Sequence, residues 1–148
     1  MKHPVIDILE DLVRIQSVNP HYGDGANGEM ELSRYIERFF RRIGLPVRRQ
    51  PVAEGRDNLI VELRTGHPDS VLLYEAHMDT VSLGSMERPL VPAIRDGRLF
   101  GRGACDTKGS LAAMMYAMEQ CARYPELLRC DLVLCASVDE EHAFTGLL

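Results

Sequence analysis

Two short apolar runs constrain the fold of this chain more than any other feature of its 148 residues. Residues 71–77 (VLLYEAH) and 131–138 (DLVLCASV) carry almost continuous apolar side chains over the length of a single strand. Such runs are typical of strands that are covered on both faces, which occur mainly in parallel sheets. A third run, residues 58–64 (NLIVELR), predicts another strand.

Segments with helical spacing alternate with these strands. Residues 5–16, 29–45 and 107–122 repeat apolar side chains every three or four positions, and Gly44 is the expected end of the second helix. The pair Asp96-Gly97 lies between two short apolar runs and predicts a tight hairpin. We therefore predict an α/β fold, a three-layer sandwich of helices around a mostly parallel mixed sheet.

Composition argues against several classes of function. The net charge of -5 disfavours non-specific binding of nucleic acid, which requires a basic surface. No apolar run approaches the roughly 20 residues of a membrane span, and acidic residues interrupt the N-terminal apolar segment, so no signal peptide is predicted. The four cysteines include no C-x-x-C pair. We predict a cytoplasmic protein without nucleic-acid or membrane partners.

The glycine-containing segment 99–118 (LFGRGACDTKGSLAAMMYAM) looks at first like a phosphate-binding loop. The phosphate loop requires Gly-Lys-Ser/Thr, but here Lys108 precedes Gly109. The dinucleotide pattern G-x-G-x-x-G begins correctly and then has Asp106 in the place of its third glycine, where a carboxylate would repel a pyrophosphate. Both patterns therefore disfavour a nucleotide site.

Asp106 is the chemically informative residue of that segment. It stands at the start of a predicted helix, whose positive end favours the ionised carboxylate. Gly101 and Gly103 allow the chain before it to turn tightly and to approach another group closely. Taken alone, Asp106 is equally well explained as a simple helix cap, whereas a poorly solvated carboxylate would need a cation partner.

Two further groups of polar residues follow the buried strands. His77 and Asp79 end the first strand, and Asp139, Glu140 and Glu141 follow the second. A carboxylate beside a histidine can fix its tautomer, and adjacent acids repel one another unless a cation offsets their charge. A lone histidine is usually structural and an acidic turn is usually solvated, but three such groups at strand ends, where α/β sheets bind ligands, indicate a metal site.

The motifs HMDTV (77–81), GRGACDTKGSLAAM (101–114) and DEE (139–141), in this order, resemble the M20 metallopeptidase family. This family includes acetylornithine deacetylase, succinyl-diaminopimelate desuccinylase, aminoacylases and carboxypeptidase G. The resemblance extends over nearly the whole chain. It implies a zinc-peptidase-like fold, two Zn²⁺ (or Co²⁺) ions that share an aspartate and a water, and a cis peptide between Asp106 and Thr107.

The resemblance also implies a role for each motif residue. His77 is similar to the ligand of one ion, Asp106 to the bridging carboxylate, and Glu141 to a ligand of the other ion. Glu140 is similar to the general base. Asp79 is similar to the carboxylate that orients the histidine ligand.

Members of the family are much longer than this chain. The resemblance therefore implies that residues 1–148 are a truncated catalytic domain, its N-terminal part, without its C-terminal part and without the lid and dimerisation domain. The absent part would supply one acidic and one histidine ligand. We therefore expect weak or no metal occupancy and no activity for this fragment alone, and self-association through exposed strand edges. The full-length protein is expected to be a homodimer.

The implied function is a hydrolase that uses a metal-activated water to cleave an amide bond of an N-acyl amino acid or small peptide. The motifs HMDTV and GRGACDTKGSLAAM favour an activity like that of acetylornithine deacetylase. A desuccinylase, a dipeptidase and an acylase are the alternatives. A hypothesis of another class is a non-catalytic protein, either a truncated relic or a binding module that keeps the fold.

Overall fold

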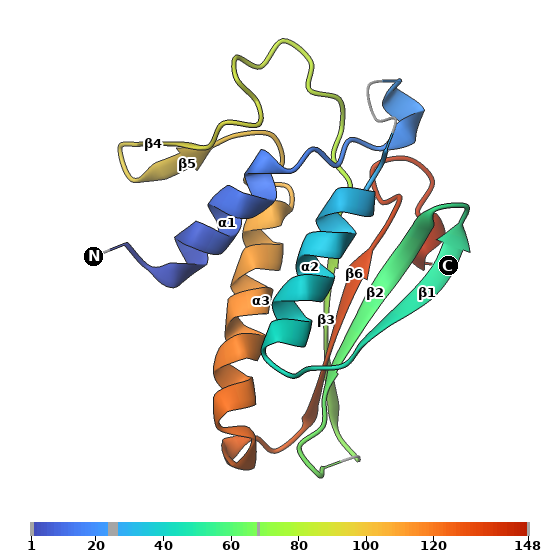
Figure 1. Cartoon of the computed structure of the whole chain (residues 1–148), viewed down its shortest axis with the longest axis vertical. Coiled ribbons are helices and arrows are strands. Elements are labelled where there is room, and N and C mark those ends of the chain that lie inside the picture. The colour runs from blue at the N-terminus through green and yellow to red at the C-terminus, as the bar shows by residue number, and fades with distance from the viewer. Residues whose placement is uncertain (1, 24–26, 68, 148) are drawn as a thin grey trace.

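A computed structural model describes residues 2–23, 27–67 and 69–147 (Figure 1). In chain order its elements are α1 (Pro4–Arg14), η1 (Pro20–Tyr22), α2 (Met30–Arg42), β1 (Val47–Ala53), β2 (Arg56–Leu63), β3 (Val71–His77), β4 (Ala93–Arg95), β5 (Arg98–Phe100), α3 (Lys108–Arg123), η2 (Pro125–Leu127), β6 (Asp131–Ser137) and η3 (Thr145–Leu147). Within the described ranges, no helix is long and apolar enough to cross a membrane.

The main sheet is mixed and has the strand order β1-β2-β6-β3. β3 and β6 run parallel, whereas β1 with β2 and β2 with β6 are antiparallel. The predicted α/β fold with a mixed sheet is confirmed, but the mostly parallel pairing that we expected is not observed in the described strands. The apolar runs predicted correctly which segments are strands. Their continuous apolar character, which is typical of parallel sheets, did not predict the direction of β2, which pairs antiparallel with β6.

β1 is the strand that the sequence analysis missed. It consists of VRRQPVA, and most of its side chains are exposed. An edge strand needs few apolar residues and tolerates Pro51, because the proline lacks an N–H that a central strand would require. β1 pairs with β2 through a turn at Glu54 and Gly55, which explains the antiparallel direction of this pair.

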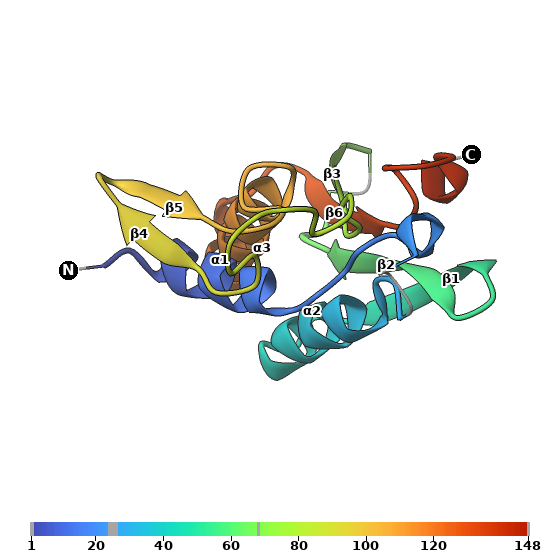
Figure 2. The same ribbon diagram turned by 90° about the horizontal axis from the view of Figure 1, so that it is seen from above.

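The helices cover one face of the main sheet. α2 contacts β1 and β2, α3 contacts β3 and β6, and α1 packs on α3. Seen from above, α2 and α3 lie on the same side of the sheet (Figure 2). On the other face Val71 and Leu73 are 58% and 59% exposed. The described residues therefore form two of the three predicted layers.

The core lies between this sheet face and the helices. Alternate side chains of β2 and β6 point toward the helices, so that paired positions share one buried surface. Its paired members are Leu59 with Ala136, Val61 with Leu134, and Leu63 with Leu132. Phe40 of α2 is completely buried against this surface. Burying an aliphatic or aromatic side chain stabilises the fold by about 1.5–3 kcal/mol.

The helix ends follow from local sequence. Pro4 opens α1, where its missing N–H costs nothing, and the His3 Nδ1 accepts a hydrogen bond from the Val5 N–H at 3.3 Å. α2 ends before Gly44, which has φ +81° and confirms the predicted helix terminus.

This topology brings the predicted polar groups to one edge of the sheet. Because β3 and β6 are parallel and His77 is paired with Ser137, both strands end at the same level. The segment after each strand, and the start of α3 at Lys108, therefore meet at this edge (Figure 1).

We expect Phe40→Ala to lower the free energy of unfolding by about 3–5 kcal/mol, because the truncation leaves a cavity between α2 and the sheet. The matched control is Leu127→Ala, since Leu127 is 72% exposed and should change stability little. Urea unfolding followed by circular dichroism measures both. Equal effects of the two substitutions would contradict the assignment of this core.

Candidate metal centre

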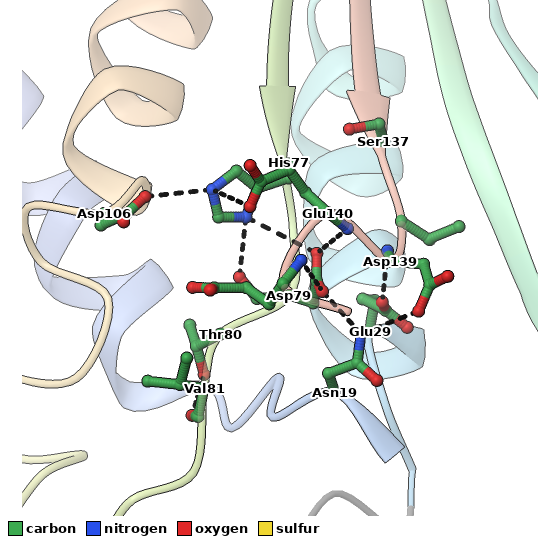
Figure 3. A network of polar contacts seen from close by, with 12 residues as sticks. Asn19, Glu29, His77, Asp79, Thr80, Val81, Asp106, Ser137, Asp139 and Glu140 are labelled. Carbon is green, nitrogen blue, oxygen red and sulfur yellow. Dashed lines mark hydrogen bonds and ion pairs between the residues drawn. The ribbon is translucent and has the colours of Figure 1, made fainter. Parts of the chain in front are cut away.

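His77, Asp106 and Glu140 converge beyond the ends of β3 and β6 (Figure 3). The His77 Nε2 lies 3.1 Å from the Asp106 Oδ1 and 3.6 Å from the Glu140 Oε2. These residues come from three segments that are distant in the sequence, as the strand-end argument predicted.

A group of one imidazole and two carboxylates could hold a divalent ion here. His77, Asp106 and Glu141 each offer one ligand atom, and these atoms all lie within 4.8 Å of one another. Zinc ligands lie about 2.0–2.2 Å from a tetrahedral ion and therefore about 3.3–3.6 Å from one another. The His77 Nε2 and the Asp106 Oδ1, 3.1 Å apart, are close to this separation. Imidazole nitrogen with carboxylate oxygen suits zinc and related transition metals. The residues present therefore fit a metal in both spacing and chemistry.

The loop before Asp106 approaches its neighbours as closely as its glycines allow. Gly103 has φ +74°, and a Cβ atom there would lie 2.8 Å from the Thr80 Cγ2. The peptide between Asp106 and Thr107 is cis, as the resemblance implied. The Asp106 side chain is 78% exposed, so its carboxylate is not the poorly solvated one considered from the sequence.

Lys108 ties this loop to the first helix. Its side chain is buried, and its Nζ donates a hydrogen bond of 2.7 Å to the Ile15 carbonyl oxygen just after α1. Burial lowers the pKa of Lys108 to about 7. The sequence analysis gave this lysine no role outside the rejected phosphate loop. Its position directly after the Asp106 turn was the only signal.

The buried carboxylate of Asp79 connects the two strand ends. It accepts hydrogen bonds from the backbone N–H groups of Glu140 at 3.1 Å and Glu141 at 3.0 Å, and from the Asn19 Nδ2 at 2.7 Å. The His77 Nδ1 lies 3.0 Å from the Asp79 carbonyl oxygen but 3.5 Å from its carboxylate. Asp79 therefore contacts His77 mainly through its backbone, while its side chain fixes the acidic turn.

A second row of polar contacts supports this turn from behind. The Asn19 Nδ2 also donates to the Asp139 Oδ1 at 2.9 Å. The Arg56 guanidinium pairs with Asp139 at 3.0 Å and forms two hydrogen bonds with Glu29, at 2.5 and 2.9 Å. Arg56 thus offsets the charges of the two buried acids.

The pKa values report the strong negative field at this edge. Burial alone would lower the pKa of His77, but the carboxylates of Asp79 and Asp106 outweigh it and raise that pKa to about 9. For Asp79, burial is outweighed by the neighbouring His77 imidazole and by hydrogen bonds from Asn19 and the Glu141 N–H, so its pKa lies below the ordinary value. Burial, with nearby carboxylates, raises the pKa of Glu141 against the opposing effect of His77. Positive charge is therefore favoured here.

Three contributors to this site were not found from the sequence. Asn19 and Arg56 lie outside the helices and strands predicted from the sequence, and Glu29 lies at the start of a predicted helix. Their contacts span 27 to 120 positions of the chain, and no periodic pattern marks such partners.

The sequence pattern of peptidase family M20/M25/M40 matches residues 73–147, just over half of the chain. The chain belongs to this family. The matched segment contains His77, Asp79, Asp106, Glu140 and Glu141, so the M20 pattern includes the edge of the sheet where these residues meet.

Known proteins agree with the M20 assignment. A probable succinyl-diaminopimelate desuccinylase of Staphylococcus epidermidis is 33% identical over 140 residues, which are 92% of this chain and 32% of that protein. The M20 chain thus spans about a third of the length of the curated relatives it matches.

Two solved structures share the fold. The di-peptidase Dug1p of Saccharomyces cerevisiae has a TM-score of 0.79 at 15% identity, covering 97% of this chain and 33% of that one. The YXEP protein of Bacillus subtilis, a dinuclear metal-binding peptidase of the M20 family, has a TM-score of 0.65 at 14% identity, covering 93% and 35%.

We expect Asn19→Asp to destabilise the M20 chain by several kcal/mol. The substitution places a third carboxylate between Asp79 and Asp139, and it removes the Asn19 amide group that donates a hydrogen bond to each of them. Asn27→Asp is the matched control, since Asn27 is exposed. Thermal unfolding near neutral pH measures the difference. An Asn19→Asp protein as stable as the control would contradict the hydrogen-bond network.

Proposed function

We propose that the full-length protein containing this chain is a metal-dependent hydrolase that cleaves an amide bond of an N-acyl amino acid or small peptide. The observation that carries this proposal is the convergence of His77, Asp106 and Glu141 within 4.8 Å of one another, with Glu140 beside them. Membership of the M20 family supports the same reaction class.

In this proposal His77 and Asp106 hold one divalent ion, and Asp106 and Glu141 hold the other. Asp106 can serve both ions because a carboxylate has two oxygens. When bound, such a pair of ions would polarise an amide carbonyl and would lower the pKa of a water. Zinc or cobalt suits the imidazole and carboxylate donors.

Glu140 is the proposed general base. Its carboxylate lies 3.6 Å from the His77 Nε2, and its backbone is held by Asp79, so the side chain is directed at the same space. It would accept a proton from the attacking water and deliver it to the leaving amine. The role proposed for Asp79 is to hold Glu140, Glu141 and His77 in fixed positions relative to one another.

Two of the sequence motifs and one relative bear on the substrate class. The motifs HMDTV and GRGACDTKGSLAAM favour an activity like that of acetylornithine deacetylase. The relative from Staphylococcus epidermidis supports a desuccinylase as the alternative. Both activities release an acyl group from an amine by the same chemistry. We propose a cytoplasmic homodimer, and we retain the absence of nucleic-acid and membrane partners as a prediction.

The chain itself supplies an incomplete set of ligands in this scheme. Each ion receives two protein ligands from the described residues, whereas catalytic zinc usually has three. We therefore propose that residues 1–148 are the N-terminal part of the catalytic domain, with weak metal binding and no activity alone. The alternative, a non-catalytic binding module, shares this weak binding and differs in lacking turnover at full length.

We expect Glu140→Gln in the full-length gene product to lower kcat by about 10²–10⁴-fold, because it removes the general base. Metal uptake should be unchanged, since Glu140 is not a proposed ligand. The assay uses a panel of N-acetyl and N-succinyl amino acids with added zinc or cobalt. Glu126→Gln is the control, because Glu126 is exposed and distant from the site.

Each outcome has a distinct meaning. Equal turnover in Glu140→Gln and the wild type would remove Glu140 from its role. A wild-type protein that takes up metal and hydrolyses no member of the panel, or any dipeptide, would favour the binding module.

A further inference from the structure

Two arginines face each other across the β4–β5 hairpin. Arg95 and Arg98 are directly paired on either side of the Asp96-Gly97 turn that the sequence predicted, and Ala93 is paired with Phe100. Side chains at paired positions lie on the same face of a hairpin, and like charges placed there destabilise it. The pairing of Arg95 with Arg98 therefore destabilises the hairpin, and nothing within the described residues of the hairpin offsets this repulsion.

The same face of the hairpin lines a cavity of about 520 Å³. The opposite wall comes from the segment between β3 and β4, which arches beside the hairpin (Figure 1) and contributes Met86, Arg88 and Val91. Met86, Val91 and Phe100 are between 41% and 51% exposed, so the cavity combines apolar surface with arginines.

No described residue forms an ion pair with the arginines that line this cavity. The guanidinium groups of Arg88, Arg95 and Arg98 form no hydrogen bond or ion pair with any residue in the described ranges. Glu87 is the one acid that lines the cavity. A local excess of positive charge is notable in a chain with a net charge of -5.

We propose that this cavity binds an organic carboxylate carried on an apolar or aromatic body. Arginine guanidinium groups match the two oxygens of a carboxylate, which would also relieve the repulsion between Arg95 and Arg98. Phe100, Met86 and Val91 provide the surface for the apolar body. The volume lies within the range of about 300–1,000 Å³ that is usual for small-molecule sites.

The cavity is separate from the metal centre. It contains none of His77, Asp106 and Glu141, although Cys105 lines it and directly precedes Asp106 in the chain. A ligand here would contact the loop that carries Asp106 without occupying the space between the proposed metal ligands. The inference therefore goes beyond the proposed function and does not depend on it.

The test compares 4-phenylbutanoate with its neutral isostere 4-phenylbutanamide by isothermal titration calorimetry, on protein dialysed free of metal. The acid should bind at least about tenfold more tightly than the amide, because a charged hydrogen-bonded group contributes on the order of one tenfold step in affinity. Equal affinities for the two probes, or no binding of the acid at millimolar concentration, would overturn the proposal.

Variants locate the binding. The double substitution Arg95→Gln with Arg98→Gln should weaken binding of the acid by at least about tenfold. It should also raise the melting temperature of the protein slightly, since two facing charges are removed. Arg129→Gln is the matched control, because Arg129 is exposed and lies outside the cavity lining. The single variant Arg98→Gln serves if the double variant does not fold.

Binding of the acid that survives the double substitution would refute the site. Glu140→Gln should bind the acid as the wild type does. If the acid does not bind, the proposal for the metal centre is therefore unaffected. If the full-length protein shows no turnover, the proposal for this cavity is unaffected.

Discussion

The buried carboxylate of Asp79 is the contact on which the arrangement of the site depends. It follows β3, accepts the backbone N–H groups of two residues after β6, and accepts the Asn19 amide as well. A carboxylate with three donors stays ionised and rigid even where burial opposes its charge. Because both oxygens are used on the turn after β6, Glu140 and Glu141 are held beside His77.

The electrostatic repulsion among the acidic side chains at this edge of the sheet is offset differently behind and in front of the turn. Behind the turn, Asp139 and Glu29 are paired with Arg56 and receive further hydrogen bonds. In front of it, Asp106, Glu140 and Glu141 form no ion pair with a lysine or arginine in the described ranges, and Asp106 and Glu140 pair with His77. The rear of the site is neutralised by the protein, and the front is left to attract an external cation.

Much of this could be predicted from the sequence, because the physical signals were local. Apolar spacing predicted α1, α2, α3, β2, β3 and β6, and the strand-end positions of His77 and Glu141 predicted their convergence. β1 was missed because an exposed edge strand needs no apolar pattern. The mixed sheet was predicted, but the larger number of antiparallel pairs among its described strands was not, because strand direction depends on connections. Asn19 and Arg56 were missed because a buried polar network has no periodicity, and its partners are chosen by the fold.

Anomalous X-ray diffraction at the zinc absorption edge would show whether one divalent ion binds between His77 and Asp106, as we propose. Crystals would be soaked in millimolar zinc, because a high zinc concentration offsets the weak binding expected from an incomplete ligand set. We expect the strongest anomalous peak about 2.0–2.2 Å from the His77 Nε2 and from an Asp106 oxygen. Zinc found solely at other histidines, such as the stacked His21 and His142, with no peak beside His77, would contradict it.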